Sequence, residues 1–268
     1  MSRALSNHTP PRRRVALRLA TALAALATAL ACATPAAAQP PVPSGLVMVT
    51  EVWPPFRIND ERSASGFAGI DIDLTTALAE RLGVPIDIRR VPWARALEMM
   101  RNGQADLITG IAYTDERAAF LRYAPTSYAS VRPMFLARKG QGGQIGSYDD
   151  LMGKSIGMST NSAYFPRFNA DAELKKVGLS TELQILQMLA AGRIDLAIGT
   201  DPNLSYDLAR LGLKDALEPT AWQPDYRTEL YVAVSAHSPA AALVGRIDEA
   251  IKAMLADGTV EGILRRYR

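Results

Sequence analysis

Two segments of the chain repeat one pattern, and this internal repeat constrains the fold more than any other feature. Residues 99–110 read MMRNGQADLITG and residues 188–199 read MLAAGRIDLAIG. In each copy, apolar residues with helical spacing end at a glycine, and a short apolar strand follows after three residues. Glycine tolerates the positive φ that commonly ends a helix. One such unit in each half of the chain predicts two α/β lobes of similar build.

The first half alternates strand and helix patterns ahead of its repeat strand. The expected elements are a strand at Leu46–Thr50, a helix at Asp71–Leu82, a strand at Pro85–Val91 and a helix at Trp93–Asn102. This β-α-β-α-β order predicts parallel strands joined by crossover helices.

The second half begins again near Lys154 with a strand at Ser155–Met158. We expect residues 162–174 to be rich in helix. Thr181 and Gln184 have capping-box spacing at the start of the helix that ends at Gly192. Two more helices are expected at 238–256 and 259–266.

Two extended segments, Arg132–Ala137 and Thr228–Ser235, lie where one half gives way to the other. We interpret them as paired strands that cross between the lobes and form a hinge. The segment 140–144, GQGGQ, is expected to be a flexible turn or linker. The predicted lobes are 45–136 with 230–268, and 137–229.

The N-terminus has the order of regions of a secretory signal peptide. A basic segment, Arg12–Arg14, precedes the mainly apolar run Val15–Ala33, and three alanines end at Ala38. We expect residues 1–38 to be removed and residues 39–44 to form a flexible linker. A competing interpretation is lipoprotein cleavage at Cys32.

Removal of this signal changes the charge of the chain. Residues 1–38 hold five of the 30 basic residues and no acid, which leaves 25 basic against 27 acidic residues and a net charge of −2. Such a chain has no broad basic field for phosphates, so nucleic acid is not an expected partner. His237 is then the one histidine and no cysteine remains, which excludes Cys/His catalytic pairs and zinc clusters.

Acidic pairs near turns and helix starts offer little support for a metal site. Asp71 and Asp73 fit a helix-start pattern, and Asp149 and Asp150 fit a polar turn, so solvated carboxylates are the expectation for all four.

The ends of the predicted strands give candidates for a ligand site. In open parallel sheets, ligands bind at the carboxyl ends of the strands, and two hinged lobes would bring these ends to one cleft. The candidates are Trp53, Phe56, Trp93, Arg95, residues 109–117, residues 159–164, Thr200 and Asp201. Arg95 could equally pair with a surface acid.

Several of these segments resemble the family 3 solute-binding proteins of ABC importers. The motifs are GIDIDL at 69–74, TGIAYTDER at 109–117, WPPF at 53–56, LMGKSIG at 151–157 and GRID at 192–195. They follow the family's order, and the likeness covers about residues 45–268. The resemblance implies the type II periplasmic-binding-protein fold, in which two α/β lobes are hinged by two crossing strands.

The resemblance also implies roles for site residues. Arg117 would hold a ligand carboxylate, helped by Thr109 and Gly110, because a guanidinium stays charged and offers a planar fork to two oxygens. Trp53 would cover the ligand side chain.

Four positions depart from the family pattern. Asn161 and Ser162 stand where Gly-Thr is usual, and Ala112 lacks a common hydroxyl. The aspartate that holds a ligand ammonium is replaced by Thr200, with Asp201 one residue later. Either Asp201 serves, or that anchor is absent and the ligand is not a standard α-amino acid.

The resemblance implies a periplasmic receptor that captures an amino acid or similar small carboxylate. It would act as a monomer, without a cofactor, and deliver its ligand to the permease subunits of a membrane importer. Two alternatives stay open: a periplasmic enzyme on the same scaffold, like cyclohexadienyl or arogenate dehydratases, and a soluble partner of a separate sensor.

Overall fold

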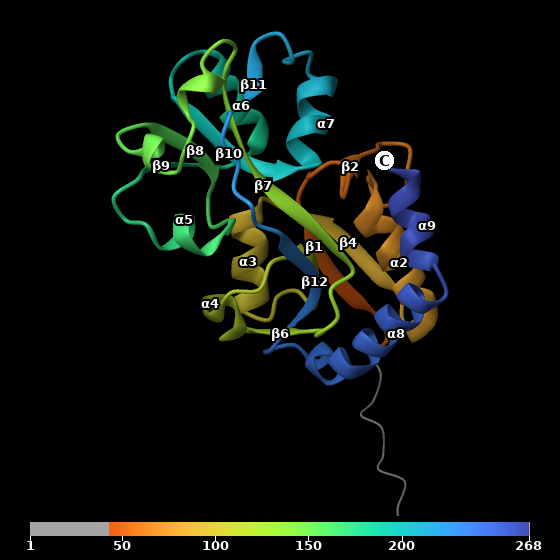
Figure 1. Ribbon diagram of the computed structural model, residues 1–268. Coiled ribbons are helices and arrows are strands. Elements are labelled where there is room, and N and C mark those ends of the chain that lie inside the picture. Colours follow the sequence, from red (N-terminus) through yellow and green to blue (C-terminus); the bar gives the residue numbers. More distant parts are fainter. Residues whose placement is uncertain (1–42, 268) are drawn as a thin grey trace, which may run out of the picture. The chain divides into compact units, whose positions relative to one another are not determined.

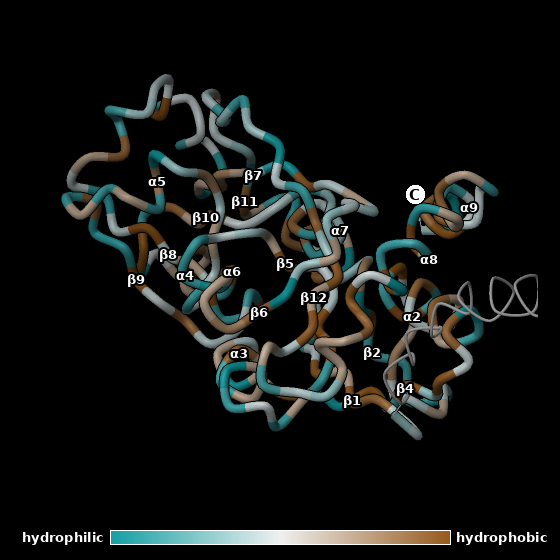
Figure 2. Tube along the Cα trace, turned by 90° about the horizontal axis from the view of Figure 1, so that it is seen from below, coloured by the Kyte–Doolittle hydropathy of each residue, from teal (hydrophilic) through white to brown (hydrophobic). Residues whose placement is uncertain are grey.

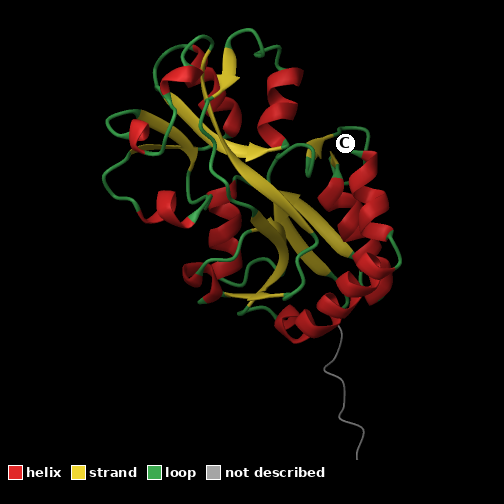
Figure 3. Ribbon diagram, viewed as in Figure 1, coloured by secondary structure: helices red, strands yellow, loops and turns green. Residues whose placement is uncertain are grey.

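A mixed β-sheet runs through both halves of the chain in the computed structural model, which describes residues 43–267 (Figure 1). Among these residues the strand order is β4-β1-β5-β12-β7-β10-β8-β9, with β6 beside β12 and β11 beside β7. The predicted signal peptide 1–38, Cys32 and most of the linker 39–44 lie outside the described residues. Figure 3 shows helices covering the outer sides of the strands.

The first lobe is built around three parallel strands, with β1 between β4 and β5. Its strands are β1 (Leu46–Thr50), β2 (Ile58–Asn59), β3 (Phe67–Ala68), β4 (Ile86–Arg90), β5 (Leu107–Ile111), β6 (Leu121–Tyr123) and β12 (Thr228–Ser235). Its helices are α2 (Ile70–Leu82), α3 (Trp93–Arg101), α4 (Asp115–Ala118), the 3-10 turn η3 (Pro239–Leu243), α8 (Val244–Ala256) and α9 (Thr259–Arg266). Apolar residues concentrate along β1 and β12 (Figure 2). Successive side chains of β1 enter opposite layers, so that Met48 packs toward α2 and α8 while Val49 packs toward α3.

The second lobe repeats this plan with β8 between β9 and β10. Its strands are β7 (Ala129–Arg138), β8 (Ser155–Ser159), β9 (Lys175–Leu179), β10 (Leu196–Asp201) and β11 (Leu217–Pro219). Its helices are η1 (Gly142–Gln144), η2 (Asp149–Leu151), α5 (Pro166–Ala170), α6 (Glu182–Ala190) and α7 (Asn203–Arg210). Ala197 packs in the layer of α6 and α7, whereas Ile198 packs in an aromatic layer beside α5.

The predicted crossing strands are present as β7 and β12. They pair antiparallel over three residues, Thr228–Leu230 against Ala129–Val131. Beyond this short ladder, β12 pairs with β5 in the first lobe and β7 pairs with β10 in the second. The two-lobed α/β fold with a two-strand hinge is therefore confirmed.

The prediction of a helix-rich segment at 162–174 is wrong. Only α5, five residues long, is helical there. Pro166 forces the preceding residue into an extended conformation, and Phe165 and Phe168 are drawn into the aromatic layer of the lobe. Packing of large rings, rather than helical periodicity, decides the path of this segment.

The segment 140–144 is a turn held in place by a carboxylate rather than a flexible linker. Glu218 Oε1 accepts hydrogen bonds from the backbone N–H groups of Gly140 and Gly142, each at 2.9 Å. A side chain at Gly142 would place its Cβ 2.6 Å from the Pro219 carbonyl oxygen. Glycine is therefore needed at position 142, because the neighbouring backbone leaves no room for a side chain.

The expectation that Asp71 is solvated is also wrong, because Asp71 is fully buried at the start of α2. Its Oδ2 is paired with Arg57 Nη1 and accepts from Thr109 Oγ1 at 3.0 Å, while its Oδ1 accepts from Tyr128 Oη at 2.5 Å. Arg57 is equally buried and also donates from Nε to the Glu51 carbonyl at 3.1 Å. The pair joins α2, β5, the loop after β1 and the entry to β7.

We expect Asp71→Asn to destabilise the protein by about 3–5 kcal/mol, because it leaves the buried Arg57 without its counterion. Urea unfolding of the mature protein measures this change. Asp149→Asn is the matched control: its pair with Arg167 is exposed, so the free energy of unfolding should change by less than about 1 kcal/mol. Equal stability of the two variants would contradict the role given to Asp71.

Candidate functional site

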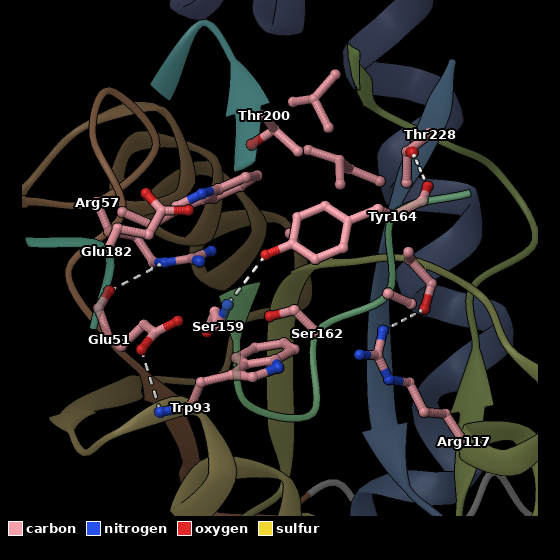
Figure 4. A pocket seen from close by; sticks show the side chains of 16 residues that line it. Glu51, Arg57, Trp93, Arg117, Ser159, Ser162, Tyr164, Glu182, Thr200 and Thr228 are labelled. Atoms are coloured by element: carbon pink, nitrogen blue, oxygen red, sulfur yellow. Dashed lines mark hydrogen bonds between the residues drawn. The ribbon is translucent and has the colours of Figure 1, made fainter. Parts of the chain in front are cut away.

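A cavity of about 60 Å³ lies at the carboxyl ends of the parallel strands of both lobes (Figure 4). The first lobe lines it with Glu51, Trp53, Arg57, Trp93, Gly110, Ala112 and Arg117. The second lobe contributes Ser159, Ser162, Ala163, Tyr164, Glu182 and Thr200, and the crossing strands contribute Val131, Thr228 and Leu230. A molecule in this cavity would touch both lobes and the hinge.

Arg117 is a buried cation at this cavity, with 5% of its surface exposed. The helix α4 that carries it starts at Thr114, whose Oγ1 accepts from the Arg117 backbone N–H at 3.2 Å. The guanidinium donates to two neutral acceptors, from Nη1 to the Ala112 carbonyl at 2.9 Å and from Nη2 to the Asn161 carbonyl at 2.8 Å. No carboxylate of the described residues lies within 4.0 Å of it. Burial lowers the pKa of Arg117 from its ordinary value.

Asn161 presents its carbonyl to the first lobe because of its backbone conformation. It is the one non-glycine residue with positive φ in the described chain, at 63°. Asparagine enters this left-handed region more readily than most side chains, which explains how a residue other than glycine can occupy this turn. The same carbonyl accepts from Trp93 Nε1 at 3.4 Å. Asn161 thereby contacts the first lobe through its main chain and does not line the cavity.

Aromatic rings form two walls of the cavity. Trp53 stacks on Phe56 with centroids 4.5 Å apart, and the Arg57 guanidinium lies 4.9 Å from the Trp53 ring. Phe56 is buried against Trp53 and does not line the cavity. On the other side, Tyr164 Oη accepts from the Ser159 N–H at 3.2 Å, and the Tyr164 carbonyl accepts from Thr228 Oγ1 at 2.9 Å.

Gly110 lets the backbone of β5 approach the buried ion pair. It has φ 64°, and a Cβ there would lie 2.5 Å from Arg57 Nη1 and 2.8 Å from Asp71 Oδ2. The side chain of the neighbouring Thr109 donates to Asp71 Oδ2 and does not line the cavity. Gly110 therefore lines the cavity and Thr109 supports it from behind.

Two carboxylic acids, Glu51 and Glu182, face the cavity from opposite lobes. Burial raises the pKa of Glu51 to about 7, against the opposing effect of Arg57 and of the Trp93 N–H that Glu51 accepts at 3.1 Å. Burial also raises the pKa of Glu182 to about 8, and the charges of Asp207 and Glu51 add to this effect. Both acids therefore carry protons over part of the neutral pH range.

The sequence-derived site residues separate into two groups. Seven line the cavity, namely Trp53, Trp93, Gly110, Ala112, Arg117, Ser162 and Thr200. Four lie behind or beside it, namely Phe56, Thr109, Asn161 and Asp201. Asp201 follows Thr200 on strand β10, where successive side chains point to opposite faces, and it accepts from Ser205 Oγ at 2.5 Å. Arg95 forms an exposed pair with Glu98 at 2.8 Å.

The ligand-site candidates taken from the sequence did not include Glu51, Arg57, Glu182 or the residues of the crossing strands. Glu182 is the first residue of α6, directly beyond β9, and helix N-termini after parallel strands face the ligand crevice. Glu182 could have been predicted as a cavity residue if β9 had been recognised as a strand. The sequence of β9, KKVGL, lacks the clear apolar alternation that predicts a strand.

Comparison with known proteins assigns the chain to a family. The model of bacterial extracellular solute-binding proteins, family 3, matches residues 46–268, so the chain belongs to this family. The L-cystine-binding protein TcyA of Bacillus subtilis is 23% identical over 218 residues, covering 80% of this chain and 77% of that protein. The L-cystine-binding protein TcyJ of Escherichia coli is 26% identical over 225 residues, covering 83% and 81%.

A solved structure of an ancestral arginine-binding protein bound to glutamine has the same fold. It superimposes with a TM-score of 0.72 at 23% identity and covers 85% of this chain and 99% of that one. The family and the fold make this chain a two-lobed solute-binding protein. Within residues 43–267, no helix has the length and apolar character to span a membrane, and no cluster of three potential metal ligands occurs.

The raised pKa values predict how stability depends on pH. Unfolded glutamates lose their protons near pH 4.5, whereas folded Glu51 and Glu182 keep them up to about pH 7 and about pH 8. The folded state binds more protons in this window, so stability falls as pH rises through it. We expect Glu182→Gln to flatten this decline and to melt higher than the wild type above about pH 8.

Thermal melting of the ligand-free protein across this pH window measures the effect. The control is Glu116→Gln, since the Glu116 side chain is 83% exposed and its removal should leave the pH profile unchanged. A Glu182→Gln profile parallel to that of the wild type would show that Glu182 does not titrate in this window.

Proposed function

We propose that this protein captures an amino acid or a similar small carboxylate in the cavity between its lobes and delivers it to the permease of an ABC importer. The observation that carries the proposal is the buried guanidinium of Arg117, which has two carbonyl partners and no carboxylate partner among the described residues. A buried charge without a counterion is unfavourable, and an anionic ligand would supply the missing charge.

The position of Arg117 also links ligand capture to lobe closure. Its Nη2 already donates to Asn161 of the second lobe, and Asn203 Nδ2 donates across the lobes to the Pro54 carbonyl at 2.8 Å. A solute in the cavity would add contacts to residues of both lobes. Such a ligand binds the closed arrangement better than an open one, which is the condition for a ligand-driven closure.

The relatives support the amino-acid class. Their names refer to L-cystine and arginine, and both ligands carry the carboxylate that Arg117 would bind. Trp53 and Trp93 offer apolar surface for the remainder of the solute.

We also propose that the signal peptide 1–38 directs export of the protein to the periplasm, and that the protein acts there as a monomer. The comparisons do not favour the enzymatic alternative.

We expect Arg117→Ala to weaken binding by about ten- to over a hundredfold, because a charge-assisted hydrogen bond contributes about 1.5–3 kcal/mol. A thermal-shift screen with L-cystine, L-arginine and L-glutamine selects the probe, since a ligand at about 100 times its Kd stabilises by about 2.7 kcal/mol. Titration calorimetry then gives the affinities of the variants.

Arg122→Ala is the matched control, because Arg122 is exposed on the neighbouring strand β6 and outside the cavity. It should bind the probe as the wild type does. Unchanged affinity in a folded Arg117→Ala protein would remove Arg117 from the ligand site.

A further inference from the structure

The candidate site contains two carboxylates that no cation of the described chain neutralises. Glu51 and Glu182 form no ion pair with a lysine or arginine within 4.0 Å. The nearest cation in the cavity, Arg57, has its charge balanced by Asp71. The site thus holds two acidic groups whose negative charge, once they are ionised, has no counterion within the described chain.

These acids and Arg117 lie on opposite sides of the cavity. Figure 4 shows Glu51, Glu182 and Arg57 grouped on one side, and Arg117 on the other, with Tyr164 and Ser162 between them. The cavity therefore has an acidic end and a cationic end. A dipolar solute would complement both ends only if its positive group lay far from its carboxylate.

A buried hydroxyl provides an independent sign of a polar ligand. Thr200 is 7% exposed and lines the same cavity, and its Oγ1 has no hydrogen-bond partner among the described residues. Buried hydroxyls are normally satisfied, so this oxygen marks a place where a ligand donor or acceptor is missing.

We propose that Glu51 and Glu182 bind a positive group at the end of the solute remote from its carboxylate. The inference rests on the function proposed above. It narrows the solute to amino acids whose side chains carry an amine or a guanidinium. The carboxylate would pair with Arg117 and the side-chain cation with the acid pair.

The surroundings of the acid pair determine how strongly it holds protons. Arg57 opposes protonation of both acids, whereas Asp207 favours protonation of Glu182. Asp207 is itself paired with Arg210 at 3.1 Å, and Arg90 lines the adjacent cavity that the two acids also border. The Tyr164 hydroxyl is kept neutral because burial raises its pKa.

Exchange of a cation for a proton makes binding depend on pH. Near the raised pKa values of about 7 and about 8, the free site is partly protonated and the bound site is ionised. Binding therefore releases protons to solvent, and affinity for a cationic solute should rise with pH through this range.

L-Arginine and L-citrulline test the proposal, because they have similar length and only arginine carries a side-chain charge. Titration calorimetry of the mature protein should show arginine binding at least about tenfold tighter than citrulline at about pH 8.5, with a smaller ratio at about pH 5.5. Heats measured in buffers of different ionisation enthalpy should report proton release with arginine and none with citrulline.

Glu182→Gln should reduce the preference for arginine and leave citrulline binding in place. Glu51→Gln provides a second variant if the first does not fold, and Glu116→Gln is the exposed control. Equal affinity for the two probes, or a preference that survives both substitutions, overturns the acid-pair proposal but leaves the function proposed for Arg117 standing. If neither arginine nor citrulline binds, the acid-pair proposal is overturned. If no amino acid in the thermal-shift screen raises the melting temperature, the proposed function is overturned as well.

Discussion

The buried pair between Arg57 and Asp71 is the interaction on which the rest of the site depends. It connects the first turn of α2, strand β5 and the loop after β1, and Tyr128 extends it to the first residues of the hinge. These four segments are separate in the sequence, and each also contributes buried residues to one apolar core, among them Phe56, Ile70, Leu107 and Tyr128. The charged pair sets their relative positions, and through them the orientation of Trp53 and Gly110.

The two buried arginines of the cavity show how similar groups acquire different roles. Arg57 has an internal counterion, so its charge serves the fold. Arg117 donates hydrogen bonds only to main-chain carbonyls of the described chain and lies 5.5 Å from the centre of the Trp93 ring, so its position is fixed without a carboxylate partner. Carbonyl dipoles orient a guanidinium without neutralising it. This difference separates a structural cation from one that is available to a ligand.

Much of the fold and part of the site could be predicted from the sequence. The repeat and the strand-helix alternation predicted the parallel strands because these patterns arise from local periodicity. Asp71 was misjudged because its partner Tyr128 lies 57 residues away and nothing local marks the pairing. Thr200 and Asp201 could not be told apart by counting, since a shift of one residue in a strand reverses the direction of every side chain.

The crossing strands are paired over only three residues, and one residue of β7 and two of β12 from that same ladder line the ligand cavity. The ligand would consequently rest on the pivot about which the lobes turn. A small twist at a pivot carries the outer edges of the lobes through a large arc while moving the pivot itself very little. Contacts of the ligand with Val131, Thr228 and Leu230 would therefore change little as the lobes turn, whereas its contacts with the facing sides of the two lobes would be complete only when the lobes are closed.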